Sequence, residues 1–86
     1  MNVFERQNSI LGVEFDRYVR EHPDFSETFP QAAQIVLLKA DDEKFNEWSV
    51  NLARKQRDAS QPVVYITIKK LAPPRSRIEE LELTTR

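Results

Sequence analysis

The sequence contains no cysteine, one histidine and one glycine among its 86 residues. Without cysteine there is no disulfide framework, no thiolate zinc site, no iron–sulfur cluster and no cysteine nucleophile. A single histidine leaves too few imidazoles for a multi-histidine metal site. A single glycine excludes both the G-x-G-x-x-G dinucleotide motif and the Walker A phosphate loop. These absences argue against nucleotide-dependent enzymes built on those motifs, and we expect no cofactor.

Long apolar runs are also missing. The longest, Ile35–Leu38, is far shorter than the roughly 20 residues of a membrane-spanning helix. Residues 1–9 include Glu5 and Arg6 and no apolar stretch, which is unlike a secretory signal. We therefore expect a cytoplasmic protein with no membrane partner.

Neither sign of charge dominates, since 13 Lys and Arg oppose 14 Asp and Glu for a formal net charge of −1. A general nucleic-acid coat or a binder of anionic membranes would show a clear basic excess. Locally, however, four cations occur with no acid among them: Lys69, Lys70, Arg75 and Arg77. Three acids follow: Glu79, Glu80 and Glu82. The four cations are a candidate anion-binding or partner-binding site, and a solvated or self-paired face is the plain alternative.

The residues that are present carry the pattern of a small α/β domain that begins with a helix. Apolar residues at helical spacing predict this helix over residues 3–21, with Asn2 accepting a backbone N–H at its start. Glu5 completes a capping box, and Pro23 ends the helix because proline disfavours helical dihedrals at the residue before it. A single helical turn follows over residues 24–27.

Two strands and a second helix complete the pattern. The apolar run Gln34–Lys39 predicts a strand buried on both faces, and the β-branched run Val63–Lys69 predicts another. Between them, residues 41–57 begin with acids and end with bases, as helix termini favour. The order strand, helix, strand predicts a βαβ unit with parallel strands. Trp48 and Tyr65 occupy positions expected in the core, so they indicate no platform for stacking nucleic-acid bases.

The predicted sheet is too small to bury itself. Two parallel strands leave faces and edges uncovered, and a chain of 86 residues is only marginally stable alone. We divide the chain into one α/β domain over residues 1–72 and a C-terminal extension over residues 73–86, which is a docking arm, an edge strand or disordered. The missing strands come from this extension, from a second copy, or from both. We therefore expect a homo-oligomer, with a dimer favoured.

The first helix supplies the candidate interface with another chain. The residues expected there are Phe4, Leu11, Gly12 and Phe15. A glycine inside a helix costs about 1 kcal/mol relative to alanine. Close approach of another helix or chain explains Gly12, and a tolerated glycine explains it equally well.

Two further groups have both a chemical and a plain interpretation. His22 is a general base by residue type, with Glu21 and Asp24 close in sequence, but no motif supplies a nucleophile beside it. Its plain interpretation is a residue at a helix C-terminus, next to Pro23. The acidic residues 41–43 lack the alternating ligands and the turn glycine of a calcium loop, and their place at a helix start explains them. We expect no catalytic residue and no metal.

Two stretches, EFDRYVREHPDF (Glu14–Phe25) and QPVVYITIKKLAPPRSR (Gln61–Arg77), resemble a family of short bacterial proteins that is uncharacterised. The resemblance covers most of the chain, with helix, strand, helix and strand in the same order. It contains no catalytic motif, and the family brings no established activity, cofactor or substrate. The resemblance implies a bacterial cytoplasmic domain of unknown function and transfers no functional residue.

Three functions are compatible with these patterns. The one we expect is a small non-enzymatic interaction or regulatory module that forms a homo-oligomer and has a protein partner. The second is binding of nucleic acid or nucleoprotein through the basic stretch Lys69–Arg77. The third is an enzyme whose site is centred on His22 at a subunit interface.

Overall fold

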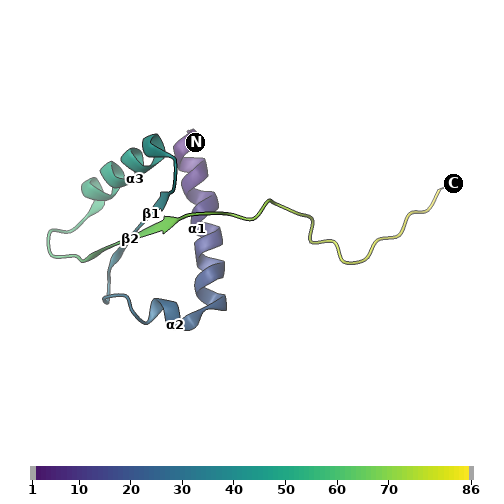
Figure 1. The fold of residues 1–86 in the computed structure, drawn as a ribbon, viewed down its shortest axis with the longest axis horizontal. Coiled ribbons are helices and arrows are strands. Elements are labelled where there is room, and N and C mark those ends of the chain that lie inside the picture. The colour runs from purple at the N-terminus through teal and green to yellow at the C-terminus, as the bar shows by residue number, and fades with distance from the viewer. Residues whose placement is uncertain (1, 86) are drawn as a thin grey trace.

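The computed structural model describes residues 2–85 and has the predicted order of helices and strands (Figure 1). In chain order the elements are α1 (Val3–Glu21), α2 (Pro23–Ser26), β1 (Gln34–Lys39), α3 (Glu43–Gln56) and β2 (Val63–Ile68). The two strands form one parallel sheet. The prediction of a small α/β domain with a parallel βαβ core is therefore confirmed.

The ends of α1 follow from local chemistry. At the start, the Asn2 side chain accepts a hydrogen bond from the Glu5 backbone N–H at 2.8 Å, which is the predicted cap. At the end, the backbone N–H of His22 donates to the carbonyl of Tyr18 at 2.9 Å, and Pro23 then opens α2. The short turn of α2 leads the chain back toward the sheet (Figure 1).

The core lies where α1, β1 and α3 meet. Leu11, Leu37 and Phe45 pack against one another and are 1, 8 and 0% exposed. Phe4 and Trp48 pack on this cluster, with their ring centroids 5.9 Å apart. Each fully buried side chain of this size contributes about 1.5–3 kcal/mol. A core this small is consistent with a domain of marginal stability.

Two side chains of α3 hydrogen-bond to the C-terminal half of the outer edge of β1, and we call them the edge latch: Asn46 and Ser49. Asn46 accepts from the Lys39 backbone N–H at 2.7 Å and donates to the Lys39 carbonyl at 2.9 Å. The buried Ser49 hydroxyl donates to the Leu37 carbonyl at 3.0 Å. These backbone groups point away from β2, because alternate residues of a parallel strand face opposite neighbours. The edge latch thus satisfies groups that would otherwise be open to another strand.

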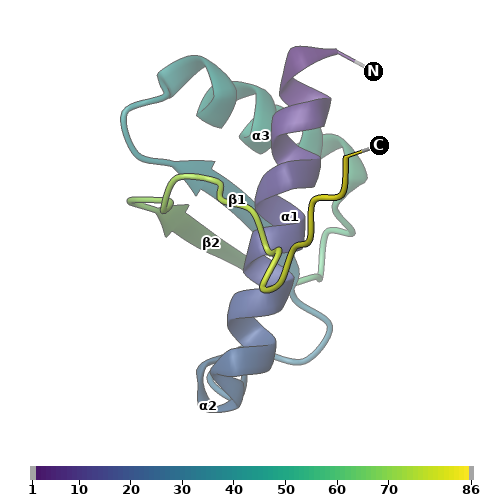
Figure 2. The same cartoon turned by 90° about the vertical axis from the view of Figure 1, so that its right-hand side faces the viewer.

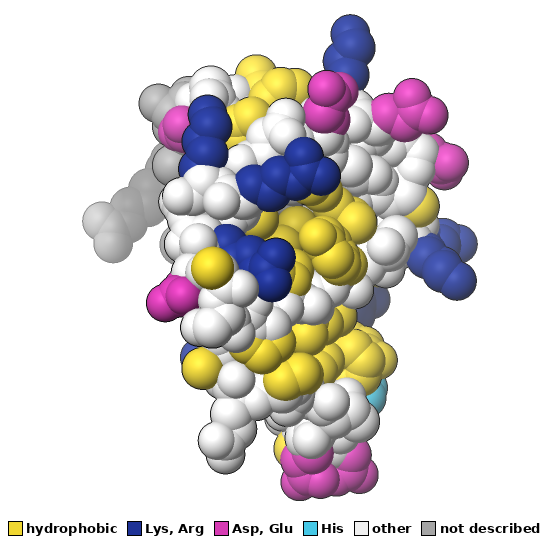
Figure 3. All heavy atoms as spheres, turned by 90° about the vertical axis from the view of Figure 1, so that its left-hand side faces the viewer, with side chains coloured by type: hydrophobic (Ala, Val, Ile, Leu, Met, Phe, Trp, Pro, Cys, Tyr) yellow, Lys and Arg dark blue, Asp and Glu magenta, His cyan; other side chains and the backbone are white. Residues whose placement is uncertain are grey.

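The second strand has no such cover. Among residues 2–85, no helix has a Cα atom within 8 Å of a Cα atom of β2, whereas α1 and α3 both approach β1. Tyr65 is 57% exposed, although Val36, its register partner on β1, is only 2% exposed. The prediction that Tyr65 lies in the core is therefore wrong, because a two-stranded sheet leaves the space beside β2 open. On the side of the molecule opposite α1, hydrophobic side chains gather in a strip that Lys and Arg side chains cross (Figure 3).

Residues 69–85 contain neither helix nor strand, and all of them are exposed. The segment leaves the end of β2, crosses α1 and runs out beyond the domain (Figures 1 and 2). The longest dimension of the molecule is 64 Å for this reason. Three large apolar side chains in this extension are exposed by 65, 81 and 90%: Ile78, Leu81 and Leu83. The extension is thus an arm without strand pairing in the described part of the chain.

Candidate interaction groove

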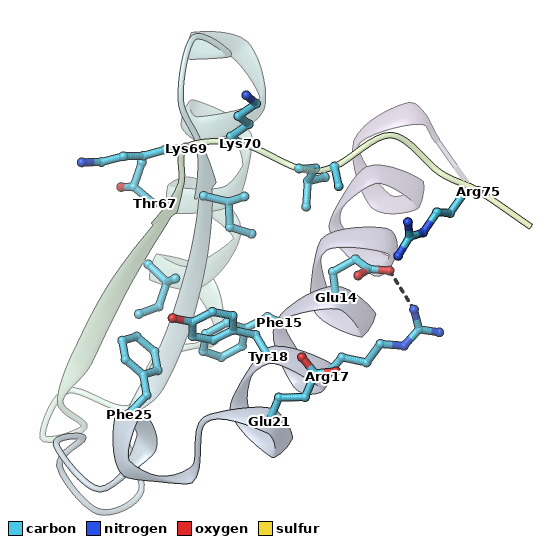
Figure 4. Close-up of a pocket in the computed structure, with 14 residues that line it drawn as sticks. Glu14, Phe15, Arg17, Tyr18, Glu21, Phe25, Thr67, Lys69, Lys70 and Arg75 are labelled. Atoms are coloured by element: carbon cyan, nitrogen blue, oxygen red, sulfur yellow. Dashed lines mark hydrogen bonds and ion pairs between the residues drawn. The ribbon is translucent and has the colours of Figure 1, made fainter. Parts of the chain in front are cut away.

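A groove of about 820 Å³ runs between α1 and β2, and we call it the β2 groove (Figure 4). It exists because α1 packs over β1 and lies further from β2, of which Ile66 and Ile68 are only half-buried. Its apolar part is formed by three aromatic side chains from α1 and α2 and by two isoleucines of β2. These are Phe15, Tyr18, Phe25, Ile66 and Ile68.

The aromatic side chains support one another and so give the groove a defined shape. The ring of Phe25 meets Phe15 edge-on at a centroid distance of 6.4 Å and Tyr18 at 5.5 Å. Phe29 stacks on Phe15 at 6.4 Å from the far side of this group. Tyr18 keeps 47% of its surface exposed. The groove therefore presents aromatic surface to a ligand without first having to open.

The rim of the β2 groove is charged, with four cations and two carboxylates. The cations are Arg17, Lys69, Lys70 and Arg75, and the carboxylates are Glu14 and Glu21. Arg17 donates to Glu14 at 3.3 Å, and the Arg75 side chain points toward this pair (Figure 4). Lys69 and Lys70 lie at the opposite end of the close-up (Figure 4). The rim is thus net positive by two charges, four minus two.

Three of the four candidate cations identified from the sequence line this groove, and the fourth does not. Lys69, Lys70 and Arg75 are on the rim, whereas Arg77 lies further along the arm. Sequence reasoning missed Arg17, which comes from a different element. A signal for it existed: Glu14, Arg17 and Tyr18 stand three and four residues apart, which places them on one face of a helix.

Comparison with known proteins identifies one family. A model of a family of unknown function, DUF5647, matches residues 2–81. The chain belongs to this family. No curated protein and no solved structure matches the chain. The resemblance to an uncharacterised family is therefore confirmed as membership of DUF5647, and the family supplies no activity to transfer.

The candidate interface residues of this DUF5647 chain pack mostly within it. Leu11 is in the core, and Phe4 and Phe15 pack against that core. Gly12 lines a second hollow of about 450 Å³ between α1, α2 and β1. A Cβ added to Gly12 would meet no atom within 4 Å beyond its chain neighbours and the backbone of its own helix, so no packing contact in the described chain requires a glycine there. Their role between chains stays a prediction.

His22 lies at the C-terminal end of α1, next to Pro23, as expected for a residue with a structural role at a helix end. Its Nδ1 lies 2.9 Å from the carbonyl oxygen of Tyr18, so Nδ1 carries the proton and donates. The imidazole stacks on the Tyr18 ring at a centroid distance of 4.1 Å and is exposed. These contacts hold the end of the helix in the DUF5647 fold. An enzyme centred on His22 stays a hypothesis, and unchanged activity of a His22→Ala variant would exclude it once an activity is found.

The acidic residues before α3 act as a helix start. Asp42 accepts from the Phe45 backbone N–H at 3.1 Å and from Gln7 Nε2 at 3.3 Å, so both carboxylate oxygens have partners. No group of three or more metal-ligating side chains is present among residues 2–85. In the same residues of this DUF5647 chain, no helix is long and apolar enough to cross a membrane.

Proposed function

We propose that this chain is a non-enzymatic interaction module that assembles with a second copy of itself through the open side of β2. The observation that carries the proposal is the uneven cover of the sheet. The edge latch occupies the outer edge of β1, whereas β2 has an uncovered edge, an exposed Tyr65 and the β2 groove beside it. Unpaired strand edges and exposed aromatic surface are features of protein–protein contact sites.

The backbone of β2 supports strand pairing at this edge. Gln34 N–H donates to the Pro62 carbonyl, and Ala40 N–H donates to the Ile68 carbonyl. In the parallel ladder, even-numbered residues of β2 therefore face β1. The backbone groups of the odd-numbered residues, Val63, Tyr65 and Thr67, face the opposite way, toward the open edge. A strand from another copy can pair there with the backbone donors and acceptors of these three residues.

The test is the solution mass of the full chain, measured by gel filtration with light scattering between about 10 and 200 µM. A dimer gives about 20 kDa, twice the 10.1 kDa of one chain. The Thr67→Pro variant removes an outward N–H that the β1–β2 ladder does not use, so it should fold and remain monomeric. Thr67→Val keeps that N–H and should dimerise. A wild-type chain that stays near 10 kDa throughout overturns the proposal.

A second variant that introduces no proline shows whether a monomeric Thr67→Pro protein results from lost pairing or from a folding defect. Tyr65→Lys places a charge at the open edge, which natural sheets use to prevent pairing, and it should also give a monomer. Val13→Lys is the matched control, because Val13 is 56% exposed on α1, close to the 57% of Tyr65. Circular dichroism reports whether each variant is folded.

The gathering of three cations on one rim favours anion binding as the second candidate function. Lys69, Lys70 and Arg75 project around a groove with aromatic walls, which suits a single-stranded nucleic acid. Binding of a fluorescent oligonucleotide should then weaken steeply with salt. An Arg75→Ala, Arg77→Ala double variant with unchanged affinity and salt dependence would reject this candidate.

A further inference from the structure

Two parts of the molecule are complementary in charge and both have apolar surface, and they do not contact each other within one chain. One is the β2 groove, which has an aromatic floor and a net positive rim. The other is the acidic arm, which we define as Ile78–Leu83, with the sequence IEELEL. Its three apolar side chains are at least 65% exposed, and its Ile78 N–H donates a hydrogen bond to the hydroxyl of Ser76, just before the arm.

The charges of the two parts are opposite in sign, with three negative charges on the arm and a net two positive charges on the rim. The acidic arm carries three carboxylates and no cation: Glu79, Glu80 and Glu82. The rim of the groove carries Lys69, Lys70 and Arg75 together with the paired Arg17. Opposite charges across an interface speed association and suppress wrong partners.

The side-chain pattern of the acidic arm fits a strand beside β2. In an extended segment, residues two apart point to the same side, so Leu81 and Leu83 project together. That side suits the apolar floor near Tyr18 and Phe25. The backbone of the arm then pairs with the outward groups of Thr67 and its neighbours, as in other cases of strand addition to a sheet edge.

The course of the chain directs the acidic arm away from its own groove. Pro73 and Pro74 follow the rim residues and form a stiff, extended spacer. The sequence after Pro62 contains no glycine, asparagine or aspartate, the residue types that most readily adopt the positive φ of the tightest turns. In the structure the chain accordingly continues outward past α1 (Figure 1). Residues 76–83, if extended, reach about 26 Å beyond Arg75.

We infer that the acidic arm of one copy occupies the β2 groove of a second copy, and that the second returns its own arm to the first. This inference rests on the proposed self-assembly and names the segment that produces it. Two-fold symmetry makes the two contacts equivalent and closes the assembly at two chains. The exchange supplies β2 with the strand that the chain itself does not place there.

The experiment uses paired charge reversals in the full chain. The arm variant carries Glu79→Lys, Glu80→Lys and Glu82→Lys, and the groove variant carries Lys69→Glu, Lys70→Glu and Arg75→Glu. All six positions are exposed and outside helices and strands, so both variants should fold. The matched control reverses three exposed cations that do not line the groove: Arg6→Glu, Lys44→Glu and Arg54→Glu. Masses are measured by light scattering at about 50 mM salt, where screening is modest.

The expected result is that the dissociation constant of the dimer is at least tenfold higher for each variant alone than for wild type. An equimolar mixture of the two variants should recover the dimer mass. Mixing restores opposite charges at both contacts only if the arm docks on a different copy. The control should dimerise like wild type. If wild type dimerises but the two variants do so equally well, or if their mixture stays monomeric, the arm exchange is overturned and self-assembly through another surface stands. A monomeric wild type overturns both proposals.

Discussion

Replacing Asn46 should destabilise the domain more than any other exposed or half-buried polar residue of α3. Its amide forms two hydrogen bonds to one residue, at 2.7 Å from the Lys39 N–H and 2.9 Å to the Lys39 carbonyl, in a partly buried position. Asn46→Ala removes both and leaves two backbone groups without partners. At roughly 1–1.5 kcal/mol for each bond, the loss is about 2–3 kcal/mol. For a domain of this length that lowers the melting temperature by roughly 10–20 °C.

The Asn46→Asp variant distinguishes the hydrogen bond that Asn46 accepts from the one that it donates. A carboxylate still accepts from the Lys39 N–H but faces the Lys39 carbonyl, where the amide donated. Repulsion and partial burial raise the pKa of the introduced carboxyl above its unfolded value of about 4. Protonation restores a donor, so the variant is closest to wild type below pH 4 and loses stability relative to it as the pH rises through the raised pKa.

The assay is urea unfolding followed by circular dichroism, at pH 4 and pH 7, with Asn51→Ala as control. Asn51 is exposed on the same helix, and its replacement by alanine should change the free energy of unfolding by less than about 0.5 kcal/mol. If Asn46→Ala unfolds at the same urea concentration as the control, the edge latch does not stabilise β1. A loss for Asn46→Asp that is the same at both pH values would refute the assignment of donor and acceptor.

Three further substitutions test the fold. Leu11→Ala should cost about 3 kcal/mol in urea unfolding, because a side chain 1% exposed leaves a cavity; a loss below about 1 kcal/mol would contradict its place in the core. Asp42→Ala should cost about 1–2 kcal/mol, since it removes the cap on Phe45 N–H; an unchanged midpoint would contradict the cap. Ala32→Gly should raise the melting temperature by a few degrees, because Ala32 has a φ of 57°, and a fall would refute strain there.

The elements could be predicted from the sequence because their signals are local. The bounds of α1 depend on Asn2 and Pro23, a few residues from the helix ends they control. The run Gln34–Lys39 is a strand over its full predicted length, and the second strand ends at Ile68, one residue before its predicted end. β-Branched and aromatic residues are enriched in strands, so runs of this length indicate strands. Parallel pairing followed from the helix between them.

The candidate site could be predicted only in part, because it depends on what lies beside each strand. Tyr65 lies in a run of β-branched and aromatic residues, where a side chain in the core is expected. Its side chain is nevertheless exposed, because α3 covers only β1. The edge latch could not be predicted from the sequence either. Asn46 and Ser49 are ordinary polar residues of a helix, and their role appears only when that helix is placed against the edge of β1. Arg17 joins Lys69 on one rim although the two residues are 52 positions apart in the sequence, 69 minus 17. Such proximity follows from packing and not from any local pattern.

The two edges of this sheet differ in a way that limits how large an assembly can become. A subunit with two open strand edges pairs at both and grows into a filament, whereas one with a single open edge closes after one pairing. Asn46 and Ser49 occupy the β1 edge with side chains of the same subunit. The β2 edge has no lysine or proline at its outward positions within the strand, Val63, Tyr65 and Thr67, where a chain that avoids pairing would carry one. Under the proposed self-assembly, the two hydrogen bonds of Asn46 that stabilise the fold would therefore also favour a closed pair over continued growth.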